Sequence, residues 1–295
     1  MTDLRAFEPA APDHGDGGLV RLRIDLGYDG TAFAGWAVQP GLRTVQREVE
    51  TALSTALRCP GLRVVCAGRT DTGVHARGQV VHVDVPRPAY DELGATANVG
   101  GVARLGRRLA GLLPRDIGVR AVNVAPEGFH ARFSPLWRRY AYRVSDAPFG
   151  PDPLRRFDVL AHRFPLDVAA MDAAARELVG HHDFAAYCRR REGATTVRTL
   201  LELSWTRVDD MVEARVMADA FCHHMVRSMV GACLAVGEGR QDVGWPAEVL
   251  AGRVRRPDLT VAAARGLTLE EVRYPDDVEL ALRAAETRAR RVPPI

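Results

Sequence analysis

Residues 62–85 join an apolar run, a polar loop and a second apolar run, in the order LRVVCAGRTDTGVHARGQVVHVDV. Residues 62–66 are typical of a short strand. Residues 81–85 alternate apolar and polar side chains, as a half-buried strand does. The polar, glycine-rich residues 68–78 lie between them. This pattern predicts a loop held at both ends by strands of one sheet.

The loop Gly68–Ala76 has two possible roles. It could be a tight surface turn, because Asp and Gly are favoured in turns. A turn needs only two such residues, however, whereas this loop brings together the Asp71 carboxylate, the Arg69 guanidinium and the His75 imidazole. Loops supported by rigid strands are common places for catalytic groups. The composition therefore favours a functional loop.

Strands and helices alternate along the rest of the chain, without a short-period repeat. Apolar periodicity and breakers predict further strands at 19–28, 117–124, 138–144, 197–208, 212–220 and 272–274. The same patterns predict helices at 45–57 (capped by Thr44), 102–113, 168–179 and 223–236, with a short helix near 249–250. This order predicts an α/β chain of the α+β class, made of two related halves, 19–130 and 131–275. Residues 1–18 are expected to be a disordered leader, and 276–295 an exposed tail.

Composition excludes several classes of protein. The 295 residues are 47% hydrophobic and 26% charged, with a net charge of +3, which fits a globular protein of about two domains. The N-terminus has acidic residues and no apolar run, so no signal peptide is expected. No apolar stretch reaches the ~18 residues of a membrane span. Five cysteines without a CxxC pair predict reduced thiols in a cytoplasmic protein.

Arg227 is unusual because its predicted helix is apolar on every side. Such a helix should be buried, and a buried guanidinium needs a carboxylate partner. The pair could be purely structural, or the carboxylate could be catalytic. Asp71 is the candidate partner.

The strand 137–142 reads WRRYAY and combines positive charge with aromatic rings. Arg138 and Arg139 could contact phosphates while Tyr140 stacks on a base, as in proteins that bind nucleic acid. The alternative is a plain strand with half-buried tyrosines. Short arginine clusters elsewhere in the chain make phosphate contact more plausible.

Two adjacent histidine pairs, His181-His182 and His223-His224, raise the question of a metal site. Neighbouring side chains on a helix or strand diverge, and no H-E-x-x-H or CxxC spacing supports a site, so no metal is expected. The chain also lacks the glycine-rich motifs of nucleotide hydrolases and dinucleotide enzymes. No cofactor is expected.

Together these features resemble the TruA family of tRNA pseudouridine synthases. The resemblance rests first on the loop Gly68–Ala76 and runs in order along about residues 19–275. It includes Asp29-Gly30, Phe33, Gly35-Trp36, Thr44-Val45-Gln46, Leu113–Ile117, Phe129–Phe133, Arg138-Arg139-Tyr140, Gly180–Phe184, Val197-Arg198-Thr199, Phe221–Gly231 and Gly266-Leu267. One departure is Ala110, where the family often has Asn in the helix before Leu113.

The resemblance implies a pseudouridine synthase fold, in which two related α/β halves surround a large antiparallel sheet with a basic cleft between them. It also implies a homodimer that binds the anticodon stem-loop of tRNA and converts uridine to pseudouridine at positions 38, 39 and 40, without a cofactor. By motif, Asp71 is the nucleophile, Arg69 helps to hold the base out of the stack, Tyr140 stacks on the uracil, and Arg227 pairs with Asp71. His75, Arg138 and Arg139 are expected to contact the substrate.

Two other classes of function remain open. A non-catalytic tRNA-binding module would use the basic residues alone, and it would gain nothing from a carboxylate at position 71. A hydrolase would use Asp71 together with His75 to activate water.

Overall fold

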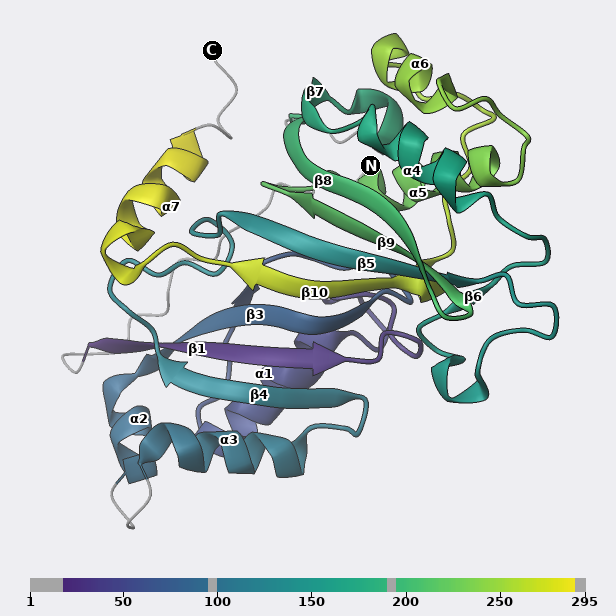
Figure 1. Cartoon of the computed structure of the whole chain (residues 1–295). Coiled ribbons are helices and arrows are strands. Elements are labelled where there is room, and N and C mark those ends of the chain that lie inside the picture. The colour runs from purple at the N-terminus through teal and green to yellow at the C-terminus, as the bar shows by residue number, and fades with distance from the viewer. Residues whose placement is uncertain (1–17, 95–99, 190–194, 290–295) are drawn as a thin grey trace.

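A single mixed sheet organises the chain in the computed structural model, which describes residues 18–94, 100–189 and 195–289. Its main path has the strand order β4-β1-β3-β10-β5-β9-β8-β7, with β2 paired to β3 and β6 paired to β5 (Figure 1). Two of the described strand pairs, β10 with β3 and β5 with β6, are parallel, and the others are antiparallel. This mixed α/β architecture with a large, mostly antiparallel sheet confirms the predicted fold class.

One end of the sheet is built by the first half of the chain. Its strands are β1 (Leu19–Tyr28), β2 (Val64–Cys66), β3 (His75–Pro86) and β4 (Ile117–Val124). Its helices are α1 (Val45–Leu57), α2 (Arg87–Gly94) and α3 (Gly101–Leu112), which gather beside this end of the sheet in Figure 1. Strand β1 alternates buried and partly exposed residues, as its sequence predicts. Thr44 is the N-cap residue of α1, but its side chain makes no capping hydrogen bond.

The other end is built mainly by the second half. Its strands are β5 (Trp137–Ser145), β6 (Leu160–Ala161), β7 (Gly180–Asp183), β8 (Val197–Val208) and β9 (Met211–Ala218). Its helices are α4 (Val168–Arg176), α5 (Met225–Gly237) and α6 (Trp245–Gly252), with short 3-10 turns at Pro153–Arg155 and Ala185–Tyr187. Every residue of α5 except Arg227 is buried, as the all-apolar sequence predicts.

Strand β10 (Leu267–Arg273) joins the two ends of the sheet. It lies between β3 and β5 and pairs with both, so the last strand of the chain closes the middle of the sheet (Figure 1). The predicted strand at 272–274 covers only its end. A register shift between Leu269 and Glu271 interrupts the alternation that would have revealed the rest.

The segment after β10, expected to be an exposed tail, is mostly exposed and contains a helix. Residues Asp277–Glu279 form a 3-10 turn and Leu280–Ala289 form helix α7, in which Leu280 and Ala284 are buried. The backbone of Gly128, with φ +74°, approaches this helix so closely that a Cβ there would lie 2.6 Å from the Cβ of Ala281. Residues 1–17 of the expected leader and 290–295 of the expected tail lie outside the described residues.

Two of the cysteines lie together in the fold. Cys188 and Cys222 have Cα atoms 5.8 Å apart, a separation that a disulfide can span, while Cys59, Cys66 and Cys233 are free. Sequence spacing could not reveal this pair, because the two residues are 34 positions apart and become neighbours only when β7, β8 and β9 fold together. Among the described helices, none has the length and apolar character needed to cross a membrane.

His82 and His130 form a buried pair whose ring centroids lie 4.7 Å apart. Nδ1 of His82 accepts a hydrogen bond from the Ala131 amide, and Nδ1 of His130 accepts from the Arg132 amide. Burial, together with the charge of Arg21, lowers the pKa of His82 to about 3. Burial, with Arg288 and Arg21 nearby, lowers the pKa of His130 to about 4. Both imidazoles are therefore neutral in the folded protein at neutral pH, although Asp84 opposes this effect.

We predict that stability falls as the pH drops from about 6.5 to about 4. In this pH window the two histidines bind protons in the unfolded chain but stay neutral in the folded protein. The free energy of unfolding therefore decreases by roughly 1–2 kcal/mol per pH unit for the pair, after allowance for solvent screening at His130. Urea titrations at a series of pH values measure this slope. His82→Asn and His130→Asn retain an acceptor near Nδ1 but cannot be protonated, so each should flatten the slope. Unchanged slopes in both variants would assign the acid sensitivity to other groups.

Candidate active site

The backbone of residues 67–74 is fixed from several directions. The Ala67 amide donates to the Val80 carbonyl, and the Trp36 amide donates to the Thr70 carbonyl at 3.0 Å. The Thr70 hydroxyl lies 2.7 Å from the buried hydroxyl of Tyr28. A Cβ at Gly35, which has φ +98°, would lie 3.0 Å from the Thr70 carbonyl oxygen, so this close approach requires glycine. These contacts hold Asp71 at the top of the loop, where its side chain remains 28% exposed.

Arg138 fixes the start of the same loop through its side chain. Its guanidinium is buried and donates to three carbonyl oxygens, those of Asp219 at 2.6 Å, Arg132 at 2.9 Å and Ala67 at 3.1 Å. Burial lowers its pKa. All three bonds are internal, so the guanidinium is engaged within the protein, and the expected substrate contact of Arg138 stays a prediction. The side chain ties Ala67, at the start of the loop, to the segment after β9.

Three cationic or titratable side chains surround the Asp71 carboxylate. Nη1 of Arg227 lies 3.6 Å from Oδ2, Nε2 of His224 lies 3.7 Å from Oδ2, and Nε2 of His223 lies 3.3 Å from Oδ1. Burial and the neighbouring His223 lower the pKa of His224. The structure thus brings Arg227 to the carboxylate named for it from sequence, and it adds two histidines that sequence analysis considered only as metal ligands.

Arg227 is held in place by the backbone of the segment before β10. Its Nε donates to the Ala262 carbonyl at 2.7 Å, and its own carbonyl accepts from the Ala262 amide at 2.9 Å. This close packing depends on Gly231, one turn further along α5, where a Cβ would lie 1.9 Å from the Thr260 carbonyl oxygen. Helix α5 therefore presents a rigid guanidinium, 18% exposed, to the loop.

Tyr140 lies beside the loop, on the same face of β5 as Arg138. A Cβ at Gly68 would lie 3.8 Å from the Tyr140 hydroxyl, and the ring of Phe221 packs edge-on against Tyr140 at 5.2 Å. Burial, with the negative charge of Asp71, raises the pKa of Tyr140, so the phenol stays protonated.

Three further residues singled out from the sequence are Arg69, Arg139 and Ala110, and none of them is among the ion-pair partners of Asp71 in the described part of the chain. Arg69 is exposed, and no described carboxylate forms an ion pair with it. Arg139 faces away from Tyr140 and pairs with Glu271 at 3.0 Å. Ala110 is exposed on α3.

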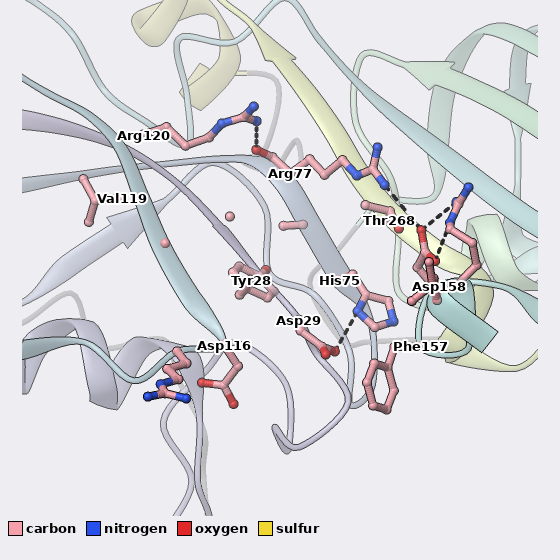
Figure 2. Close-up of a pocket in the computed structure, with 16 residues that line it drawn as sticks. Tyr28, Asp29, His75, Arg77, Asp116, Val119, Arg120, Phe157, Asp158 and Thr268 are labelled. Atoms are coloured by element: carbon pink, nitrogen blue, oxygen red, sulfur yellow. Dashed lines mark hydrogen bonds and ion pairs between the residues drawn. The ribbon is translucent and has the colours of Figure 1, made fainter. Parts of the chain in front are cut away.

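His75 lies apart from the Asp71 cluster. It begins β3, and its Nδ1 accepts a hydrogen bond from the Gly30 amide at 3.0 Å and lies 3.1 Å from Asp29 Oδ1. Figure 2 shows this contact within an open pocket that Arg77, Arg120 and Phe157 also line. His75 is not among the ion-pair partners of Asp71 in the described part of the chain. This placement removes the support for a hydrolase that uses both residues.

Comparison with known proteins identifies the family. A family model described as tRNA pseudouridine synthase matches residues 174–275. A tRNA pseudouridine synthase A from Frankia casuarinae is 61% identical over 94% of this chain and 97% of its own length. Proteins of the same name from Streptomyces griseus and Mycobacterium leprae are 55% and 50% identical, over 94% and 91% of this chain and 95% and 94% of theirs. A solved aminoacylhistidine dipeptidase from Vibrio alginolyticus, with 11% identity and a TM-score of 0.22 over 91% of this chain and 50% of that one, is too distant to bear on fold or function.

The fold and these matches define an isomerase of mixed α/β architecture. The chain belongs to the tRNA pseudouridine synthase family.

Proposed function

We propose that this protein converts uridine to pseudouridine in the anticodon stem-loop of tRNA, at positions 38, 39 and 40, by an aspartate-dependent mechanism without a cofactor. The supporting observation is the Asp71 carboxylate, which is partly exposed, held by a rigid loop and flanked by Arg227, His223 and His224. The names of the relatives support tRNA as the substrate. The positions follow from the family resemblance of the sequence.

The reaction suits a carboxylate because it balances without an added reagent. The N1–C1′ bond breaks, the C5–C1′ bond forms, and the proton on C5 is replaced by one on N1. No oxidant or phosphate donor enters. Asp71 provides the nucleophile that carries the intermediate, and Arg227 opposite it favours the ionised form.

Tyr140 and Arg69 are assigned to a separate step, the extrusion of the target base from the stem. A target within a stacked stem must leave the stack, at a cost of a few kcal/mol. Stacking on an aromatic side chain offsets about 1–3 kcal/mol of this, and we assign that role to Tyr140. Arg69 has no carboxylate partner among the described residues and is available to keep the base extruded.

For the assembly and location, we propose a homodimer in the cytoplasm. Both follow from the resemblance and from the tRNA substrate. Sedimentation of the purified protein, alone and with tRNA, tests the dimer.

We predict that Tyr140→Phe causes a milder defect than Tyr140→Ala. Phe keeps the ring face for stacking and loses only the hydroxyl, whereas Ala removes the ring and leaves a cavity beside Phe221. Single-turnover rates, measured on variants whose folding has been checked by thermal melting, compare the two. Equal defects would mean that the hydroxyl group carries the function of Tyr140.

The target positions are tested with tRNA transcripts in which uridines 38, 39 and 40 are changed to cytidine one at a time. Chemical mapping of pseudouridine after incubation should show loss at the changed position only. Modification that occurs only outside positions 38, 39 and 40, and is unaffected in all three transcripts, would contradict the proposed site while leaving synthase activity intact.

A further inference from the structure

His223 and His224 direct their side chains to the same carboxylate, although they are neighbours in sequence. Their ring centroids lie 4.1 Å apart, and each Nε2 faces a different oxygen of Asp71. Adjacent residues in a helix or strand would point in different directions. Here His224 is the N-cap residue of α5 with φ +69°, a left-handed conformation that is uncommon outside glycine. This turn of the backbone brings the two rings together.

The three side chains match the dimensions of a transition-metal site. In tetrahedral zinc sites the N and O ligands lie about 2.0–2.1 Å from the metal, so two ligands are roughly 3.3–3.4 Å apart. His223 Nε2 and Asp71 Oδ1 are 3.3 Å apart, and one ligand atom from each of the three residues lies within 4.8 Å of the others. His224 Nε2 lies 3.7 Å from the other oxygen of Asp71, so the His224 ring would have to move closer to complete a three-ligand set around one ion.

The site is also accessible. The side chains of His223, His224 and Asp71 are 22%, 23% and 28% exposed. An ion could enter from solvent, and the fourth position would hold water. Adjacent side chains usually diverge, which was one of the two reasons to expect no metal here, and the side chains of His223 and His224 do not diverge.

We propose that Asp71, His223 and His224 form a binding site for a divalent transition-metal ion of the zinc type, and that its occupancy reversibly inhibits the enzyme. The inhibitory effect rests on the proposed role of Asp71, whereas metal binding does not. A metal bound to the carboxylate occupies the lone pair that the nucleophile needs. Two imidazoles select zinc, cobalt or nickel over magnesium, which prefers oxygen ligands in an octahedron.

Arg227 opposes the ion, because its Nη1 lies 3.6 Å from the Asp71 Oδ2 that a metal would share. Removing this positive charge should strengthen metal binding while weakening catalysis. Tighter metal binding together with slower catalysis in one variant is expected only for a metal that contacts Asp71.

The test is calorimetric titration of zinc into the full-length, tag-free protein, without RNA and without thiol reductants, which would themselves bind zinc. Cobalt absorption spectra provide an independent readout. His223→Asn and His224→Asn should each raise the Kd by more than about 100-fold, since loss of a supporting contact alone costs 10–100-fold. Arg227→Gln should lower it.

The chain supplies a matched control in the second adjacent pair. His181 and His182 lie on β7, and their rings contact Thr199 and the Val179 carbonyl rather than a common partner. The double variant His181→Asn/His182→Asn should bind zinc like the unmodified protein. Equal zinc binding by the His223→Asn, His224→Asn and control variants would overturn the site.

Activity assays then separate the two parts of the proposal. Zinc at saturating concentration should stop pseudouridine formation in the unmodified protein, and excess EDTA should restore it. Zinc binding without inhibition would overturn the inhibitory role. If the protein is inactive even after EDTA while the calorimetry gives the expected changes, the proposed function fails and the metal site stands.

Discussion

Asp71→Asn is expected to reduce the single-turnover rate of pseudouridine formation by at least about 10⁴-fold, the scale seen when an essential catalytic residue is removed. The amide keeps the size and polarity of the carboxylate but is a poor nucleophile. Affinity for tRNA should stay near normal, because the loop contributes one side chain to an extended phosphate contact surface. Rapid-quench assays give the rate, and filter binding gives the affinity.

A suitable control is Asp258→Asn, which makes the same chemical change at an exposed carboxylate paired with Arg256. It should leave the rate unchanged. Substantial product from Asp71→Asn, in protein that binds tRNA normally, would remove Asp71 from the nucleophile role and favour a different group in the cluster.

Arg138→Met should lower the free energy of unfolding by about 3–5 kcal/mol. It leaves the carbonyl oxygens of Ala67, Arg132 and Asp219 without their buried donor, at about 1–3 kcal/mol each, partly offset because a buried charge is removed. Urea denaturation measures the loss. Turnover should also fall, because Ala67 begins the loop that positions Asp71.

Arg139→Met is the matched control for this prediction. Arg139 is the next residue on β5, but its guanidinium pairs with the partly exposed Glu271. Loss of such a pair costs at most about 1 kcal/mol. Equal losses of stability in the two variants would mean that the bonds to the three carbonyls contribute little, and that the loop is held by its other contacts.

The contrast between Arg138 and Arg139 marks the limit of sequence-based prediction here. Alternation along β5 requires the two side chains to face opposite sides of the sheet. The sequence does not say which face is covered, because that depends on Ala67 and Asp219, which are distant in the chain. A phosphate contact could therefore be assigned to both arginines, although the structure turns Arg138 inward.

Features set by local periodicity were predictable. Strand β1, helix α5 and the strand–loop–strand unit around Asp71 follow from apolar patterns and polar interruptions in their own sequences. The apolar surroundings of Arg227 likewise indicated a carboxylate partner, since a buried charge is costly alone.

Features set by long-range pairing or unusual backbone were not predictable. The central place of β10 depends on its pairing with β3, about 190 positions earlier in the chain. The convergence of His223 and His224 depends on one positive φ angle. No periodicity in the residues before α5 signals it.

The most direct test of the central claim uses tRNA transcripts labelled with tritium at C5 of uridine. Forming the C5–C1′ bond displaces that hydrogen, so each conversion releases one tritium to water. We expect release from the anticodon stem-loop without any added transition metal, at most one tritium for each target uridine, and none with Asp71→Asn. No release by the folded protein, despite tight tRNA binding, would contradict the account and indicate a non-catalytic tRNA-binding protein.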